Sequence, residues 1–491
     1  MKKVTSIISL LLCGIIQAQA TKPPVVSLSN PNIVFILADD LGYGELGCYG
    51  QEKIQTPHID QLAAEGMRFT QHYSGAPVCG PARCVLLTGK HLAHAEVRGN
   101  KEYKTPEKVF GGQHPLSAEA VTIAKVLKEQ GYTTGAFGKW GLGASASTGS
   151  PIKQGFDRFY GYNCQRNAHS YYPPYLDSDE EEVISNTPPI SGHMRQPKGE
   201  VLADTYRGEN YAPDLILAES LKFIDENKDK PFFLYLPFVE PHVAMQPPQE
   251  WMDRYPEEWD DKPYRGQRGY TPHPRPRAGY AAMISDLDEH VGAILARLKA
   301  YGLEDNTIVI FTSDNGATHD VGGVDTNFFN SVGELRGRKG SCYEGGLRVP
   351  CIVRYPGKVE PGTSTDTPSY FPDWFPTLTA IGGADSTQYA HDGIDLRHTL
   401  AGEPAPTRIE AMTWEFYDYG GIVAIREGKW KALRRDTLKQ TPKPWELYDI
   451  EADPSEKQDL AKQHPERVQR LEAAWLQTRI ANPTFKQPLA D

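Results

Sequence analysis

Short apolar runs and longer amphipathic stretches alternate along the chain. Five apolar runs have the length of buried strands, at residues 33–38, 133–138, 232–237, 307–312 and 349–354. Two amphipathic stretches, residues 119–130 and 281–300, have helical spacing and end at Gly131 and near Gly302. Strands that alternate with helices favour a three-layer α/β/α fold, in which a mainly parallel sheet is covered on both faces.

Polar residues follow four of these apolar runs. In chain order they are Asp39-Asp40, Lys139, Glu240 to His242, and Asp314-Asn315. In open α/β sheets, ligands bind beyond the carboxyl ends of the strands. The four clusters are far apart in sequence, and we therefore expect them to converge on one cleft.

The remainder of the chain departs from this alternation. Residues 154–210 and 255–277 are expected to be loop-rich insertions, and the acidic patch at residues 177–182 a solvated surface. Beyond about Gly393 the pattern predicts short strands and one late helix, residues 465–479. The expected organisation is therefore a leader at 1–20, a catalytic domain at 21–392 and a smaller α+β domain at 393–491.

The first twenty residues have the features of an export signal. Lys2 and Lys3 precede an apolar stretch at residues 4–16, and Ala18-Gln19-Ala20 is a small-x-small cleavage site. The pattern predicts a signal peptide and a periplasmic or secreted enzyme. The alternative is a lipoprotein anchor at Cys13, which Leu12 disfavours. No other segment has the length and apolarity of a transmembrane segment.

Charge and cysteine content narrow the class of protein. The formal net charge of −11 argues against a nucleic-acid partner, although a local basic pocket can still bind a small anion. The seven cysteines are Cys13, Cys48, Cys79, Cys84, Cys164, Cys342 and Cys351. They include no paired CxxC spacing, which argues against a zinc cage or a dense disulfide framework. One or two disulfides after export remain compatible with the sequence.

One motif carries specific chemistry. Cys79-Gly80-Pro81-Ala82-Arg83, followed by Leu87-Thr88-Gly89, matches the pattern C-x-P-x-R-x-x-x-L-T-G. Further segments match in order: residues 39–44 (DDLGYG), 138–140 (GKW), 241–242 (PH), 313–316 (SDNG) and 335–346 (LRGRKGSCYEGG). Across roughly residues 31–356, with looser similarity to residue 378, the chain resembles the formylglycine-dependent sulfatases of the alkaline phosphatase superfamily.

The resemblance implies a modified nucleophile. In this family a maturation enzyme recognises C-x-P-x-R and oxidises the cysteine, here Cys79, to formylglycine. The hydrated aldehyde is a gem-diol, one hydroxyl of which attacks sulfur. The second hydroxyl lets the enzyme expel sulfate by re-forming the aldehyde. The implied activity is that of a sulfuric ester hydrolase with an alkaline-phosphatase-like catalytic domain.

The resemblance also assigns roles to other residues. The implied metal ligands are Asp39, Asp40, Asp314 and Asn315, and their oxygen donors favour Ca2+ first and Mg2+ second. The implied catalytic residues are Arg83, Lys139, Lys339 and His242. Arg83 would support the diol and the metal carboxylates, Lys139 would bind the diol and sulfate, and Lys339 would hold a sulfate oxygen. His242, alone or with Lys339, would protonate the leaving alcohol, a task that suits an imidazole because its pKa lies near working pH.

The chain departs from the family at one position. The family usually has Gly-Lys-Trp-His-Leu-Gly where this chain has Gly138-Lys139-Trp140-Gly141-Leu142-Gly143. The missing histidine normally contacts the diol and helps to expel sulfate. We hypothesise that His169 or His319 replaces it, the alternative for each being a substrate contact or an ordinary loop residue.

The expected substrate is a sulfated saccharide. Tyr171, Tyr172 and Tyr175 could stack on sugar faces, and Arg166 could bind a second anionic group, although each could equally pack within its loop. Two other functions stay open. One is a phosphate mono- or diesterase of the same superfamily, and the other is an inactive protein that binds sulfated glycans.

Overall fold

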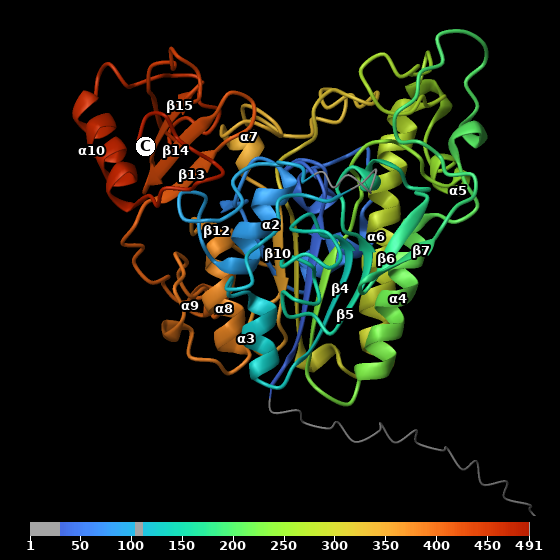
Figure 1. Cartoon of the computed structure of the whole chain (residues 1–491), viewed down its shortest axis with the longest axis horizontal. Helices are drawn as coiled ribbons and strands as arrows, with labels where there is room; N and C mark the ends of the chain where they lie inside the picture. The colour runs from blue at the N-terminus through green and yellow to red at the C-terminus, as the bar shows by residue number, and fades with distance from the viewer. Residues whose placement is uncertain (1–29, 104–110, 491) are drawn as a thin grey trace, which may run out of the picture.

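The structure is a computed structural model that describes residues 30–103 and 111–490. A large central sheet lies between two layers of helices, and a smaller antiparallel sheet with α10 (Pro465–Thr478) lies to one side (Figure 1). The predicted leader at residues 1–20, including Cys13, lies outside the described residues.

The central sheet has ten strands. In spatial order they are β11 (Thr363–Thr365), β2 (Met67–Phe69), β10 (Cys351–Arg354), β9 (Thr307–Ser313), β1 (Asn32–Ala38), β8 (Phe232–Pro237), β4 (Thr133–Lys139), β5 (Arg158–Tyr162), β6 (Tyr175–Ser178) and β7 (Glu181–Ile184). The middle strands β9, β1, β8, β4 and β5 are all parallel. The predicted α/β fold with a mainly parallel sheet is confirmed.

The edges of this sheet differ from the expectation. β10 starts at Cys351 and runs antiparallel to β9, and β6 and β7 form an antiparallel hairpin beside β5. Because β5, β6 and β7 all fall within residues 154–210, that segment is not simply a loop-rich insertion. Its acidic patch is also only partly solvated, since Asp177 is buried and accepts hydrogen bonds from Asn163 N at 3.1 Å and Ser145 Oγ at 3.0 Å.

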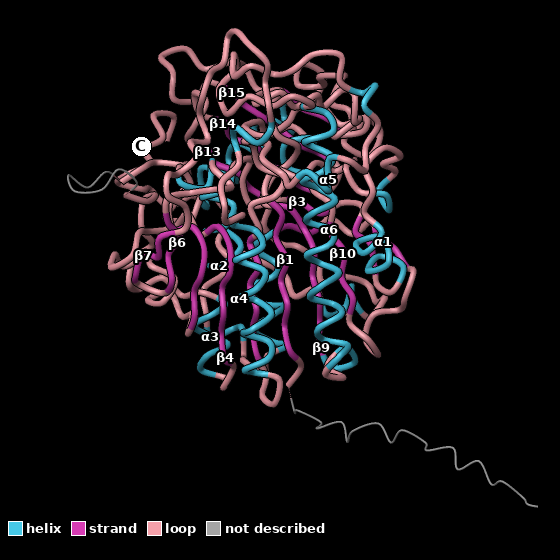
Figure 2. The backbone as a smooth tube through the Cα atoms, turned by 90° about the vertical axis from the view of Figure 1, so that its right-hand side faces the viewer, coloured by secondary structure: helices cyan, strands magenta, loops and turns pink. Residues whose placement is uncertain are grey.

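Helices cover both faces of the sheet (Figures 1 and 2). One face carries α2 (Cys79–Thr88), α3 (Ile123–Glu129) and α8 (Trp374–Ile381), and the other carries α1 (Pro57–Ala64), α4 (Ala212–Asn227) and α6 (Pro276–Ala300). Alternate residues of β1 enter the two cores: Ile33, Phe35 and Leu37 one, Val34, Ile36 and Ala38 the other. β1 is apolar throughout because both of its faces are buried.

Local sequence explains where the two predicted helices begin. α3 begins at Ile123, later than predicted, because the Thr122 side chain accepts a hydrogen bond from Lys125 N and caps the helix. α6 begins at Pro276, earlier than predicted, and proline is favoured in the first helical turn. Three short helices, α5 (Gln249–Met252), α7 (Glu344–Leu347) and α9 (Arg397–Leu400), lie in the connections.

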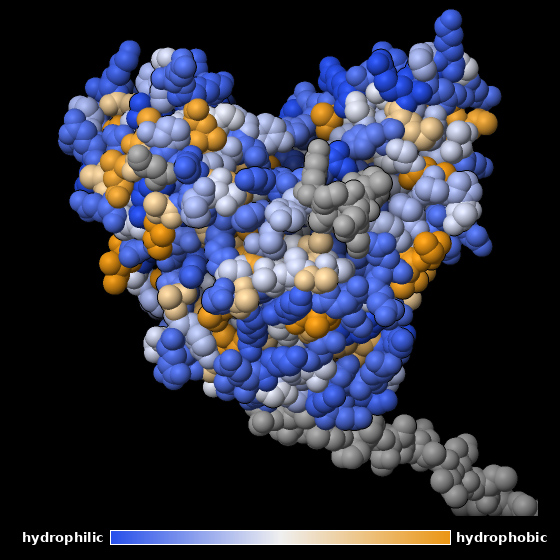
Figure 3. Space-filling model, viewed as in Figure 1, coloured by the Kyte–Doolittle hydropathy of each residue, from blue (hydrophilic) through white to orange (hydrophobic). Residues whose placement is uncertain are grey.

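The C-terminal part contains the predicted strands and late helix. Its four-stranded antiparallel sheet consists of β13 (Met412–Phe416), β14 (Ile422–Glu427), β15 (Trp430–Arg435) and β16 (Glu446–Asp449). Trp414 of β13 donates to Ser74 O at 2.9 Å and shares a core with Tyr73, which lies in β3 (His72–Tyr73), the strand paired with β12 (Ser369–Tyr370). Figure 3 shows a hydrophilic notch between this part and the lobe opposite. The boundary at residue 393 stays a prediction.

The described residues also bear on the expectations for disulfides and for membrane-spanning segments. All six cysteines in the described part, Cys48, Cys79, Cys84, Cys164, Cys342 and Cys351, are free thiols. The disulfides that the sequence allows are therefore not formed among them. Among the described helices, none combines the length and apolarity that crossing a membrane requires.

Candidate active site

The polar clusters meet at one edge of the central sheet, as predicted. β1, β8, β4 and β9 end at this edge, and Asp39, His242, Lys139 and Asp314 lie at or just beyond their ends. Ligand atoms of Asp39, Asp40, Cys79 and His242 all lie within 4.8 Å of one another, although the four residues come from distant parts of the sequence. The site is therefore assembled by the topology of the sheet.

The backbone at Asp40 brings two consecutive carboxylates into this site. In an extended strand, neighbouring side chains point to opposite faces. Asp40 instead adopts a left-handed conformation, with φ at 67°, which aspartate tolerates better than most residues. Both Asp39 and Asp40 are completely buried, and backbone hydrogen bonding beyond β1 continues as far as Asp39, whose N donates to Glu240 O at 3.0 Å.

Helix α2 presents Cys79 and Arg83 to the same site. Cys79 is the first residue of the helix, and Arg83 lies one turn later on the same face. The Arg83 guanidinium donates to Asp314 Oδ2 at 2.7 Å, to Asp39 Oδ2 at 3.3 Å and to the Lys139 carbonyl. Arg83 thereby fixes α2 against the ends of three strands.

Cys79 is buried among charged side chains. Its Sγ lies 3.4 Å from Asp39 Oδ1, 3.5 Å from Lys139 Nζ and 3.7 Å from Lys339 Nζ. Burial, and then the charge of Asp39, raise the pKa of the Cys79 thiol to about 12, despite the two lysines. The unmodified side chain is therefore a protonated thiol and not a thiolate nucleophile.

The lysines pair with the aspartates. Lys139 Nζ lies 2.5 Å from Asp39 Oδ2, and Lys339 Nζ lies 2.8 Å from Asp40 Oδ2. Burial alone would raise the pKa of Asp39, but Lys139 and the other cations lower it below its ordinary value. Burial also opposes the charge on Lys339, yet Asp40 raises the Lys339 pKa well above its usual range. Both pairs are therefore ionic.

Asn315 supplies an unpaired oxygen beside the aspartates. Its Nδ2 donates to Asp40 Oδ1 at 2.8 Å, whereas its Oδ1 is buried without a hydrogen-bond partner. Asp314 is more strongly engaged, because Oδ2 accepts from Arg83 and Oδ1 accepts from Asp40 N at 3.2 Å. A buried oxygen without a donor beside several carboxylates fits a hard cation, which binds oxygen ligands.

His242 follows β8 and is held by its own loop. Its Nδ1 lies 2.5 Å from Val243 O, its Nε2 lies 3.7 Å from Asp40 Oδ2, and the Tyr171 hydroxyl donates to its carbonyl at 2.7 Å. Burial, followed by the charges of Lys139 and Lys339, lowers the pKa of His242 to about 3. In this protein environment the imidazole is therefore neutral, and its pKa lies below the value near working pH that we expected.

Comparison with known families decides the class of protein. The profile described as "Sulfatase" matches residues 31–384, which is most of the chain. The chain belongs to the sulfatase family. A second profile, "N-sulphoglucosamine sulphohydrolase, C-terminal", matches residues 338–481 of this sulfatase.

Named relatives of this sulfatase extend over nearly its whole length. It is 32% identical to human arylsulfatase A over 474 residues, which cover 90% of this chain and 86% of the relative. It is 31% identical to the N-acetylgalactosamine-6-O-sulfatase of Bacteroides thetaiotaomicron over 502 residues, covering 90% and 92%. The crystal structure of Ps i-CgsB with k-i-k-neocarrahexaose superposes with a TM-score of 0.73 at 29% identity, covering 91% and 93%. The predicted family, fold class and enzyme class, a sulfuric ester hydrolase, are thus confirmed.

The two histidines proposed to replace the missing one lie beside the site without contacting Cys79. His169 stacks on His242, with ring centroids 5.2 Å apart, and its Nδ1 lies 2.8 Å from His193 Nε2. His319 Nε2 lies 3.4 Å from the Tyr419 hydroxyl. His193 and Tyr419 could not be predicted from the sequence, because both lie in connections without periodic patterning.

The other predicted substrate contacts, Arg166 and three tyrosines, differ in how far they are exposed. Arg166 is half exposed and forms a two-point ion pair with Glu102, at 2.6 and 2.8 Å. Tyr171 and Tyr172 are buried, at 0% and 3% exposure, and cannot stack on a sugar. Of the two alternatives, stacking on a sugar or packing within the protein, packing holds for both residues, because their rings lie against Tyr211 in the core. Tyr175 lies half-buried in β6.

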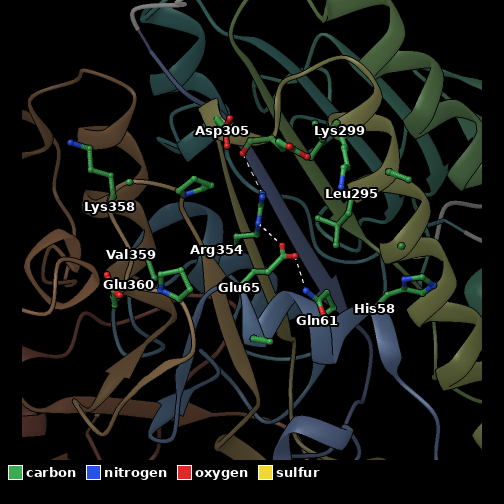
Figure 4. A pocket seen from close by; sticks show the side chains of 18 of the residues that line it. His58, Gln61, Glu65, Leu295, Lys299, Asp305, Arg354, Lys358, Val359 and Glu360 are labelled. Carbon is green, nitrogen blue, oxygen red and sulfur yellow. Dashed lines mark hydrogen bonds and ion pairs between the residues drawn. The ribbon is translucent and has the colours of Figure 1, made fainter. Parts of the chain in front are cut away.

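A large pocket elsewhere does not belong to this site. It measures about 820 Å³ and lies between α1, α6 and residues 354–361 (Figure 4). Arg354 crosses it to pair with Glu65 at 2.9 Å, and His58 and Lys299 line its rim. None of the predicted site residues lines this pocket, and we assign it no part in the chemistry.

Proposed function

We propose that this sulfatase hydrolyses sulfate esters of a sulfated carbohydrate, with formylglycine made from Cys79 and a bound divalent cation. The observation that carries the proposal is the setting of Cys79. It is buried at the first residue of α2, within 3.7 Å of two lysines and one aspartate, and its thiol stays protonated. A thiol in this state is a poor nucleophile, whereas the surrounding cations suit a sulfate group.

The two groups that complete the site have defined contributions. Formylglycine supplies a gem-diol, with one hydroxyl to attack sulfur and another to release sulfate. Asp39, Asp40, Asp314 and Asn315 would hold the cation, Ca2+ in preference to Mg2+, and the unpaired Asn315 Oδ1 supports this assignment. The cation supplies Lewis acidity and neutralises negative charge on the sulfuryl oxygens.

The cationic side chains have separate tasks. Arg83 holds residue 79 close to the carboxylates, because it lies on the same face of α2 and binds Asp39 and Asp314. Lys139 Nζ and Lys339 Nζ both lie within 3.7 Å of Cys79 Sγ, and the aspartates beside them keep both lysines charged despite burial. They are placed to bind sulfate oxygens and to stabilise charge that develops there during the reaction.

Protonation of the leaving alcohol falls to His242 and Lys339. Lys339 already holds its proton, because Asp40 raises its pKa well above the usual range. Burial and the two lysines keep the His242 ring neutral, and Nδ1 faces the Val243 carbonyl, so that a proton gained on substrate binding would reside on Nε2. The negative charge of a sulfate ester would favour that protonation.

The substrate class rests on relatives. The Bacteroides relative is named for N-acetylgalactosamine-6-O-sulfate, and Ps i-CgsB was solved with a neocarrahexaose. The hydrophilic notch between the two lobes suits a saccharide (Figure 3), and we propose His169, His319 and Arg166 as contacts. Export through the predicted signal peptide and oxidation of Cys79 by a formylglycine-generating maturation enzyme complete the proposal.

The first experiment tests Cys79 and turnover together. The protein is produced with its maturation enzyme, and peptide mass spectrometry measures whether the thiol side chain has become an aldehyde. Sulfate release from a panel of sulfated glycans is measured on the same preparation, with Cys79→Ala as the control.

Conversion together with sulfate release, lost in Cys79→Ala, is the expected result. Activity of a preparation in which Cys79 is entirely unmodified would overturn the mechanism. Conversion with sulfated-glycan binding but no release would favour the inactive binding protein over the enzyme.

A further inference from the structure

The side chain of Gln165 fills the space beside Gly141. A Cβ atom on Gly141 would lie only 2.5 Å from Gln165 Nε2 and 3.0 Å from Gln165 Cγ. Gly141 also has a left-handed backbone, with φ at 79°, which disfavours any side chain there. The position at which the family usually carries histidine is therefore taken by a glutamine from another segment.

A second glycine forms the other wall of this slot. A Cβ on Gly80 would lie 3.1 Å from Gln165 Nε2 and 2.6 Å from Asn100 Oδ1. Gly80 follows Cys79 in the first turn of α2, and Gly141 follows the end of β4 by two residues. Because neither wall has a side chain, the Gln165 amide reaches between Gly141 and Gly80, the residue that directly follows Cys79.

The glutamine is held in place but its amide nitrogen is unpaired. Gln165 N donates to Gln113 Oε1 at 2.9 Å, and both residues are buried, at 6% and 4% exposure. Gln165 Nε2 is buried without a hydrogen-bond partner. Since nearly all buried polar groups in folded proteins are paired, this donor is available to a group that maturation or substrate brings to residue 79.

We propose that Gln165 replaces the missing histidine as a hydrogen-bond donor to an oxygen atom at residue 79. That oxygen belongs either to the hydroxyl of oxidised residue 79 or to the sulfate bound there. The inference rests on the proposed function. An amide does not take up a proton at working pH, so that Gln165 orients the oxygen and does not act as the base that the histidine supplies.

The test replaces Gln165 by methionine, which has similar shape and no donor. In the matured, Ca2+-loaded enzyme we expect about tenfold weaker binding of inorganic sulfate by calorimetry, together with a lower kcat. The melting temperature should stay equal or rise, because an unpaired buried amide is removed. If Gln165 were purely structural, the variant would have a lower melting temperature and an unchanged affinity for sulfate.

Gln154→Met is the matched control. Gln154 is equally buried, but its Nε2 donates to Ser117 O and Thr148 O, both at 2.8 Å, outside the catalytic site. This variant should lose thermal stability and keep the wild-type affinity for sulfate.

Two comparisons separate the outcomes. The substitution Gln165→Met is repeated in the Cys79→Ala background. A sulfate-affinity loss that persists there assigns the contact to sulfate, and a loss that vanishes assigns it to the hydroxyl of residue 79.

Wild-type sulfate affinity and kcat in Gln165→Met overturn the inference, as does a melting temperature lowered as far as that of Gln154→Met. Failure of the proposed function itself is recognised separately, because the wild-type enzyme would then release no sulfate.

Discussion

At the scale of single residues, the site combines fully engaged ionic groups with one unengaged oxygen. Lys139 and Lys339 each have an aspartate within hydrogen-bond distance, and Arg83 binds two carboxylates. Asn315 Oδ1, in contrast, has no donor. The ionic side chains therefore already have their partners within the protein, whereas Asn315 Oδ1 depends on a cation for its partner.

Replacing Asn315 by leucine tests this reading. The variant loses the unpaired oxygen and should bind Ca2+ at least about tenfold more weakly, since a contact to a charged partner contributes about 1.5–3 kcal/mol. Asn315→Asp loses the donor to Asp40 but keeps an oxygen in the same place and adds a negative charge, which attracts the cation, so that it should retain Ca2+ binding. Calorimetric Ca2+ titration measures both. Equal affinity of Asn315→Leu and wild type would remove Asn315 from the ligand set.

Tyr171 acts on the site through the loop that carries His242. Its hydroxyl donates to the carbonyls of Val239 and His242, at 3.0 and 2.7 Å. Tyr171→Phe leaves both carbonyls without this donor and should lower the free energy of unfolding by about 1–3 kcal/mol, together with kcat. Tyr172→Phe is the control, because that hydroxyl contacts neither carbonyl. Urea unfolding and sulfate release measure the effects, and equal losses in both variants would contradict the assignment.

At the scale of elements, a buried ionic cluster joins the catalytic part to the C-terminal sheet. Lys431 of β15 lies 2.8 Å from Glu344 of α7 and 3.0 Å from Glu456, and all three side chains are buried. α7 follows Lys339 by a few residues. The cluster therefore fixes the segment that carries Lys339 against the smaller sheet.

Lys431→Met should cost about 3–5 kcal/mol of unfolding free energy, because it leaves buried carboxylates without their cation. Lys429→Met is the matched control. Lys429 pairs with Asp449 at 2.6 Å but is 44% exposed, and loss of such a surface pair costs about 0–1 kcal/mol. Chemical unfolding compares the two. Similar small losses in both variants would mean that the cluster does not hold the two parts together.

The elements also mark the limits of prediction from sequence. β1 and β9 are predictable because continuous apolar, β-branched runs signal strands buried on both faces. β5 is missed because it mixes arginine, aromatic residues and Gly161, which hides any periodicity. Motif positions at strand ends give Asp39 and Asp314, whereas the burial of Tyr171 and the placement of Gln165 beside Gly141 depend on tertiary packing that no local pattern encodes.

At the scale of the whole molecule, the buried charges of the site bear on stability. Among the described residues, three carboxylates face three cations there: Asp39, Asp40 and Asp314, with Arg83, Lys139 and Lys339. The site is thus close to neutral before anything binds. A buried excess of charge is costly, so that neither a divalent cation nor a sulfate dianion enters alone without penalty.

Ca2+ and sulfate should therefore bind cooperatively and stabilise the fold together. Ligands that bind only the folded state raise the melting temperature, and coupling of about 1–3 kcal/mol would strengthen Ca2+ binding by about 5–150-fold when sulfate is saturating. Thermal unfolding is measured across a matrix of CaCl2 and sodium sulfate at constant ionic strength, after EDTA treatment. Lys339→Met removes one cation and should bind Ca2+ alone more tightly but sulfate more weakly. Strictly additive shifts in melting temperature would contradict the charge-balance argument, since balance requires each ion to compensate for the other.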